Sequence, residues 1–221
     1  MRPEMLATYR TEPLLVLALW QPWAILCVAP DPAHGGQPAK EHETRHWAPF
    51  DQLPIRVVVH AAKRYDKENR DHFTEPRFAA ALQRAGYYAG DPRPFLDRKA
   101  LAPGVRRPVP LGAIVGLATI DRVLPTWPST GDMFKAVEPI DVASLSDDDR
   151  AFGNFAPHRF AWHLTGTVLL PEPVPFSARQ EPLYALDGRA RELVDAQLDV
   201  MLGQNTSDGD ASRVVLGQGV A

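Results

Sequence analysis

Cysteine is almost absent from this chain, since only Cys27 among 221 residues carries a thiol. A single cysteine excludes an internal disulfide framework and is typical of a reducing compartment. Cys27 lies in an apolar run, so we expect it to be buried as a small hydrophobic residue. Gln21 and Pro22 interrupt the apolar stretch 14–28, which is too short to cross a bilayer. That stretch also lacks the pattern of a signal peptide, so we expect a cytoplasmic protein without a membrane partner.

Positive charge is not in excess either. The 24 Lys and Arg residues face 27 Asp and Glu residues, and the formal net charge of -3 gives no global attraction to nucleic acid. Any such binding must come from a local patch. No G-x-G-x-x-G string follows a predicted strand and no Walker string is present, which disfavours Rossmann and P-loop sites. We therefore expect no bound cofactor.

The sequence alternates short strand-like runs with helix-like segments. Apolar and β-branched runs predict strands, whereas apolar residues at helical spacing after a proline or a capping residue predict helices. The predicted strands are 14–19, 55–60, 111–124 and 160–170, and the predicted helices begin at Gln21, near Thr74 and at Gly188. Short strands with glycines, bounded by prolines, favour an α+β fold, a small mixed β-barrel decorated with helices, over a parallel doubly wound sheet.

The chain divides into a domain, a helix and a tail. We expect them at residues 13–187, 188–202 and 203–221, the last disordered. Residues 1–12 are expected to be a loose polar leader. Gly112 and Gly116 predict a bend or a close backbone approach within a strand. The basic, proline-rich segment 90–110 fits a solvated loop better than a cationic flap over a polyanion.

The charged segment that begins at Lys40 carries the strongest functional signal, and it fits two patterns. The first is His42-Glu43-x-x-His46, which on a helix places two imidazoles on one face beside a carboxylate, as in zinc peptidases. The second is Lys40-x-x-Glu43-x-Arg45, which places one carboxylate between two cations. This second pattern indicates a domain that handles nucleic acid.

The surroundings of this segment disfavour the zinc pattern. A helix needs an apolar stripe that holds it against the core, and residues 37–46 contain no Val, Ile, Leu, Met or Phe. Pro38 and Pro49 bracket the segment. A third zinc ligand would also be needed, and Glu68 lies at a tolerable distance, but a predicted strand intervenes. We therefore predict an extended segment with two ordinary exposed histidine side chains and no metal.

Five motifs follow one another along the chain in the order of a known family. They are residues 19–24, the Lys40-Glu43-Arg45 pattern with Trp47, and residues 58–64, 112–116 and 152–155. Together they resemble an ASCH domain, a member of the PUA-like β-barrel superfamily. The resemblance covers residues 13–187, the bulk of the chain. Each motif is short, and the specificity of the match lies in their order.

The resemblance implies a barrel with a cleft whose floor carries Lys40, Glu43 and Arg45, and it implies binding of RNA or a modified nucleotide. Some relatives are hydrolases. One branch removes the acyl group of N4-acetylcytidine with a Lys, a Thr and a Glu, and another is reported to degrade RNA. Lys40 matches that Lys, but Glu43 stands where the Thr belongs, and the strand around Ala118 lacks the Glu. Lys40 and Glu43 are expected to be catalytic only if the protein is a hydrolase.

The cations of the motif are expected to contact phosphate or carbonyl groups. Its carboxylate is expected to hold a cation in place or to accept a hydrogen bond from an exocyclic amine of a base. The same three side chains also fit a structural ion-pair network that closes the barrel. Trp20 and Trp47 offer stacking surface, whereas Trp23 and Trp162 are expected to pack mainly in the core.

Three further polar residues lie at the end of the predicted strand 55–60. As a group, His60, Lys63 and Arg64 predict contacts to a nucleic-acid backbone. His60 taken alone also fits a core histidine whose ring is hydrogen-bonded. Gln21 follows the first predicted strand and completes the set of residues expected to bind the ligand.

Overall fold

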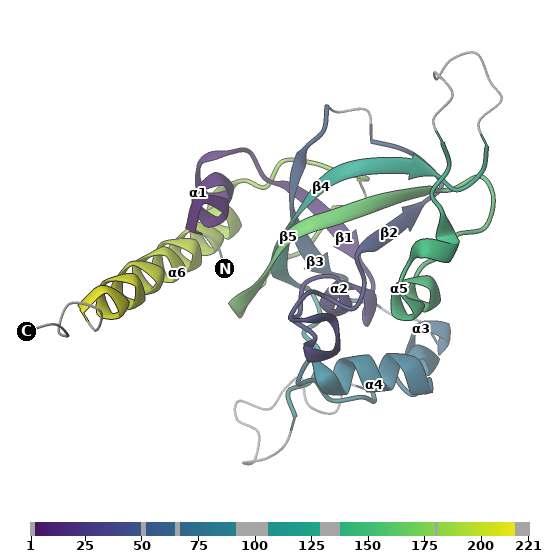
Figure 1. Ribbon diagram of the computed structural model, residues 1–221, viewed down its shortest axis with the longest axis horizontal. Helices are drawn as coiled ribbons and strands as arrows, with labels where there is room; N and C mark the ends of the chain where they lie inside the picture. The colour runs from purple at the N-terminus through teal and green to yellow at the C-terminus, as the bar shows by residue number, and fades with distance from the viewer. Residues whose placement is uncertain are drawn as a thin grey trace, which may run out of the picture.

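The computed structural model describes residues 3–49, 52–64, 67–91, 106–128, 138–179 and 181–214. Its centre is a five-stranded mixed sheet in the order β1-β3-β4-β5-β2, in which only β1 and β3 run parallel (Figure 1). The strands are β1 (Leu15–Leu19), β2 (His42–Arg45), β3 (Ile55–Ala61), β4 (Ala113–Pro125) and β5 (Phe160–Pro175). The α+β prediction is confirmed, and in the described part of the chain β1 and β2 remain edge strands of an open sheet.

Helices cover both faces of this sheet. On one side lie α1 (Pro3–Thr11) and α6 (Gly188–Val214), and on the other lie α2 (Trp23–Leu26), α4 (Pro76–Arg84) and α5 (Asp147–Phe152), as Figure 1 shows. The shorter elements are α3 (Lys67–His72) and the 3-10 turns η1 (Pro32–His34) and η3 (Val142–Ser144). Among the described helices, none has the length and apolar character that a membrane crossing requires.

The central strands are apolar along their whole length because both of their faces are covered. Side chains alternate between the two faces along a strand. In β3, Val57 and Val59 pack in the core beneath α2, α4 and α5, whereas Val58 packs in the core beneath α1 and α6. In β1, Leu17 likewise packs beneath α2, α4 and α5, and Val16 packs beneath α1 and α6. Burial on both faces explains why these strands appear in the sequence as continuous apolar runs without alternation.

The first residues form a packed helix, so the prediction of a loose polar leader is wrong. Leu6 and Tyr9 of α1 are fully buried against residues of α6. Burial also raises the pKa of Tyr9 to about 12. The last carbonyl groups of a helix have no partner within it. Here the guanidinium of Arg191 donates to two of them, those of Tyr9 and Arg10, and also to the carbonyl oxygen of Glu12, just beyond the helix. Arg191 lies near the other end of the chain, and the composition of residues 1–12 does not predict this contact.

The strand β5 is longer than predicted and runs through two prolines. Its pairing with β4 shifts register at three places, and one of these shifts separates the pair Gly116–Leu169 from the pair Ile114–Val174. Pro171 and Pro173 lie within this irregular stretch, where no ladder hydrogen bond is required of them. The strand therefore ends at Pro175 and not before the first proline.

The C-terminal helix begins at Gly188 as predicted but continues past Leu202 to Val214, over the first part of the predicted tail. Residues 215–221 lie outside the described residues. The same holds for residues 92–105, which make up most of the basic, proline-rich segment, so the loop prediction stays a prediction there.

Gly116 of β4 confirms the close backbone approach that its position predicted. A Cβ atom at this residue would lie 2.4 Å from the carbonyl oxygen of Val168 on β5 and 2.8 Å from Cβ of Val28. Gly112 marks the turn into the strand with a φ of 62°, a value that favours glycine. Both glycines are therefore needed for the pairing of β4.

We expect Gly116→Ala to lower the free energy of unfolding by about 1–3 kcal/mol, because the backbone of β5 must shift to admit a methyl group. Urea denaturation measures this change. Gly203→Ala on α6 is the matched control, since among the described residues nothing outside the helix's own backbone lies within 4 Å of a Cβ placed there. Equal stability of the two variants would show that β4 and β5 accommodate the extra methyl group without a loss of folding free energy.

Candidate functional site

A cavity of about 550 Å³ lies where the two edge strands of the sheet come near one another. Its wall is formed by the end of β1, by β2, by helices α2 to α5, and by the segment 153–159 that leads into β5. The sheet curls far enough that Arg45 of β2 donates from Nη2 to the carbonyl oxygen of Ala18 in β1, at 2.8 Å. One side chain thus bridges two edges that no backbone ladder joins in the described chain.

The charged motif lies at this bridge. Since side chains two residues apart in a strand share a face, Glu43 and Arg45 point the same way, and both line the cavity. The carboxylate of Glu43 lies between two cations: Oε1 is 3.0 Å from Nε of Arg45 and Oε2 is 3.4 Å from Nζ of Lys40. The prediction of an extended segment is confirmed by β2.

Lys40 lies behind the cavity wall and not in it. Its side chain is 1% exposed, and its ammonium group also donates to the carbonyl oxygen of His42. Lys40 is absent from the described lining of the cavity, whereas Glu43 and Arg45 belong to it. Lys40 therefore reaches a ligand only through its effect on Glu43.

Arg159 is a cavity residue that sequence reasoning missed. It lies just before β5 and donates from Nη2 to the carbonyl oxygen of Thr44, at 3.1 Å, across the pairing of β2 with β5. The motif 152–155 pointed to this part of the chain but not to the arginine. No local pattern distinguishes Arg159 from the other arginines of the sequence, so only the tertiary structure brings it to the cavity.

Two tryptophans line the cavity. Trp20 is 49% exposed, whereas Trp23 is half-buried and donates from its indole nitrogen to the carbonyl oxygen of Phe152 at 2.9 Å. Trp47 lies elsewhere, with its ring edge-on to the fully buried Trp162 at 4.6 Å between centroids. The expectation that Trp162 belongs to the core is confirmed, and Trp23 serves both the core and the wall.

Gln21 and His60 are held within the protein. Gln21 is fully buried, donates to the carbonyl oxygen of Pro110 at 2.9 Å and accepts from the backbone of Ile25. His60 is 3% exposed, with Nε2 at 3.1 Å from the carbonyl oxygen of Phe176, and burial lowers its pKa. Neither residue belongs to the cavity lining that the structure describes.

Lys63 and Arg64 are exposed just beyond β3. The preceding residue, Ala62, donates from its backbone to the carbonyl oxygen of Leu19 at 2.8 Å, which ties the ends of β3 and β1 together. Both cations therefore lie beside the strand end that carries Trp20. Neither belongs to the described lining of the cavity.

The helix required by the zinc pattern is absent, because His42 to Arg45 form β2. His46 is exposed and lines the cavity, as expected of an ordinary histidine, but His42 is only 6% exposed. Its Nδ1 lies 2.5 Å from the carboxylate of the buried Asp149, which also accepts from the backbone nitrogens of Glu41 and His42 at 3.0 Å. The expectation of an exposed His42 is wrong because α5 covers this end of β2.

The pKa of Asp149 reflects these contacts. Burial by itself raises it, but the hydrogen bonds and charge of His42, together with the charge of Lys40, outweigh burial and lower the pKa below its ordinary value. Cys27 lies near the same charges, but burial dominates there and raises its pKa to about 12. The thiol is therefore protonated at neutral pH, as expected of a small core residue.

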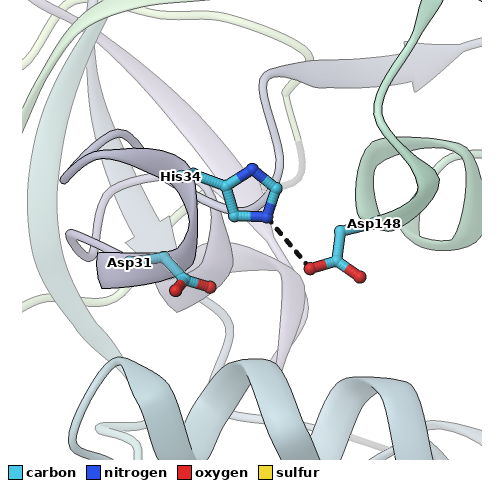
Figure 2. Close-up of side chains that lie close together, drawn as sticks. All are labelled: Asp31, His34 and Asp148. Atoms are coloured by element: carbon cyan, nitrogen blue, oxygen red, sulfur yellow. Dashed lines mark hydrogen bonds and ion pairs between the residues drawn. The ribbon is translucent and has the colours of Figure 1, made fainter.

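Three possible metal ligands gather away from the cavity. Asp31, His34 and Asp148 bring one ligand atom each within 4.8 Å of the others (Figure 2). The guanidinium of Arg84 already occupies this position, with Nη2 at 2.8 Å from Asp31 and 2.6 Å from Asp148. Burial raises the pKa of Asp31, but the hydrogen bonds from Arg84 and Ala33 outweigh it and lower the pKa. The cluster is an ion-pair network that ties η1, α4 and α5 together.

No family model matches this sequence, and no curated protein matches it. The comparison of folds finds ASCH from Zymomonas mobilis, at 15% sequence identity and a TM-score of 0.38, over 85% of this chain and 94% of that chain. It also finds a point mutant of that protein, at 13% identity and a TM-score of 0.38, over 82% and 95% of the two chains. In fold, the chain is similar to ASCH structures, the family that its sequence motifs resemble.

Proposed function

We propose that this protein binds RNA or a modified nucleotide in the cavity beside Glu43 and Arg45. The observation that carries the proposal is that one cavity brings together a carboxylate, two guanidinium groups and two indole rings. Its volume of about 550 Å³ falls in the range of small-molecule sites, which run from roughly 300 to 1,000 Å³.

Stacking supplies the first contact. Trp20 lines the cavity and is half exposed, so a face of its ring is open to a planar ligand. Stacking of a base on an aromatic side chain contributes about 1–3 kcal/mol and tolerates any base. Trp20 therefore provides affinity, and selectivity must come from polar groups.

Glu43 supplies a hydrogen-bond acceptor for the edge of the base. Its two oxygens face Arg45 and Lys40, and a carboxylate oxygen has a second lone pair available. The two cations fix its orientation. An exocyclic amine is the complementary donor, so we expect bases that carry an amine to bind more tightly than bases that do not.

Lys63 and Arg64 extend the site for a longer ligand. Both are exposed at the strand end beside Trp20, where they can contact phosphates on either side of a bound nucleotide.

The position of Lys40 supports binding over lysine-dependent hydrolysis. Its amine is buried and paired with Glu43, so it is not presented to a ligand as a nucleophile.

We expect Trp20→Ala to weaken binding of a short single-stranded RNA by about 5- to 150-fold, the equivalent of one lost stacking contact. Fluorescence anisotropy of labelled RNA, titrated at low and at physiological salt, measures the affinity. Val200→Ala is the control, because Val200 is 57% exposed on α6, away from the cavity. Tight binding by the wild type that survives Trp20→Ala would exclude this cavity as the site.

A further inference from the structure

The backbone that presents Arg159 is held rigidly. Thr126 donates from its backbone nitrogen to the carbonyl oxygen of Arg159 at 2.9 Å, and its hydroxyl accepts from the backbone nitrogen of Arg159 at 3.1 Å. The preceding residue, His158, adopts a φ of 66°, in the left-handed region that a non-glycine residue rarely occupies. Residues held in such conformations cluster at functional sites. The chain thus maintains a strained turn directly before a cavity arginine.

The side chain of Arg159 retains unused donors. Nη2 donates to the carbonyl oxygen of Thr44 at 3.1 Å, whereas Nε is buried and has no hydrogen-bond partner among the described residues. Within the described chain, no carboxylate forms an ion pair with this guanidinium. A buried charged donor without a partner is unfavourable, so an acceptor from outside the chain would stabilise it.

The charges around the cavity are also unbalanced. Arg45 and Arg159 both line it, and among the lining residues that the structure describes only Glu43 is acidic. Glu43 forms an ion pair with Arg45 and is also the partner of the buried Lys40. Arg159 therefore remains as a positive charge that the described lining does not compensate.

We propose that Arg159, assisted by Arg45, forms a subsite for a phosphate group, so that the ligand is a phosphorylated nucleotide and not a free nucleoside. The proposal rests on the function proposed above and adds the residues that bind the phosphate end of the ligand. A guanidinium presents a planar fork of donors that matches the oxygens of a phosphate. Trp20 and Glu43 then hold the base, and Arg159 sets the distance between the base and the bound phosphate.

Calorimetric titration of matched ligands tests this assignment. Each base is offered as the nucleoside, as its 5′-monophosphate, as its 3′-monophosphate and within a dinucleotide, so that a terminal phosphate is distinguished from an internal phosphodiester. We expect the wild type to bind a phosphorylated form about 10- to 100-fold more tightly than the nucleoside. Arg159→Gln should remove this preference without changing the affinity for the nucleoside. The slope of log K against the logarithm of the salt concentration should become smaller by about one. Trp20→Ala should weaken all forms equally.

Two controls separate the subsite from a folding effect. Arg159→Lys retains the charge and should retain part of the preference, and Arg122→Gln removes an exposed arginine of β4 that lies outside the cavity lining. Equal wild-type affinity for nucleoside and nucleotide would overturn the phosphate subsite alone. A preference that persists in Arg159→Gln would overturn it as well. Failure of every nucleoside, nucleotide and RNA to bind would overturn the proposed function together with the subsite.

Discussion

Glu43→Gln should lower the free energy of unfolding by about 3 kcal/mol, one of the two largest effects expected in this protein. Glutamine preserves the shape of the side chain but removes the negative charge between Arg45 and Lys40. Lys40 is 1% exposed, so its charge would be left within the protein without the carboxylate of its ion pair. Breaking a buried pair on one side costs roughly 3–5 kcal/mol. We expect the lower value because Lys40 also interacts with the carboxylate of Asp149, whose pKa its charge lowers. This second negative charge remains in the variant.

Urea denaturation at neutral pH measures this loss as a lower midpoint with an unchanged m-value. Lys40→Met combined with Glu43→Gln should recover most of the stability, since a methionine of similar volume needs no countercharge. Lys40→Met alone completes the double-mutant cycle. A change below about 0.5 kcal/mol for Glu43→Gln, the range of ordinary surface substitutions, would show that the pair has no structural role.

Asp149→Ala should destabilise the fold by a similar amount, about 3–5 kcal/mol, because it removes one partner of a buried pair. The carboxylate accepts from the backbone nitrogens of Glu41 and His42, both at 3.0 Å, and lies 2.5 Å from the ring of His42. Alanine leaves these groups without their acceptor at the start of β2, the strand that carries Glu43 and Arg45. Asp147→Ala, which removes a carboxylate of the same helix that is 73% exposed, shows how much of the loss is specific to Asp149.

The same carboxylate should make stability depend on pH. Burial raises the pKa of Asp149, but the contacts with His42 and the charge of Lys40 outweigh burial and lower it. A lowered pKa in the folded state means that the stabilisation is complete above the unfolded value of about 3.9, and that it is lost as the pH falls from there toward the folded value.

Urea titrations from neutral pH to about pH 3 should therefore show a flatter decline of stability for Asp149→Asn than for the wild type. Asp31 also has a lowered pKa, but it is present in both proteins and does not contribute to the difference between them. Parallel curves for the two proteins would indicate that Asp149 ionises in the same way whether the chain is folded or unfolded.

Much of the architecture follows from local patterns in the sequence. The apolar run 55–60 and the long run with Gly112 and Gly116 form β3 and β4, since β-branched and apolar residues favour strands and glycine permits close backbone contact. The polar, proline-bracketed segment around Glu43 could not dock a helix, so it is extended. An extended backbone by itself places Glu43 and Arg45 on one face.

Tertiary structure alone decided which of the polar residues meet the cavity. Lys40 and Arg45 are both cations of one motif, yet the first is buried behind the wall while the second bridges two strand edges. Gln21 and His60 satisfy core backbone groups, although sequence placed them with the ligand. Arg159 gave no local signal. Burial of a polar side chain depends on partners distant in the chain, and a pattern of neighbouring residues contains no information about them.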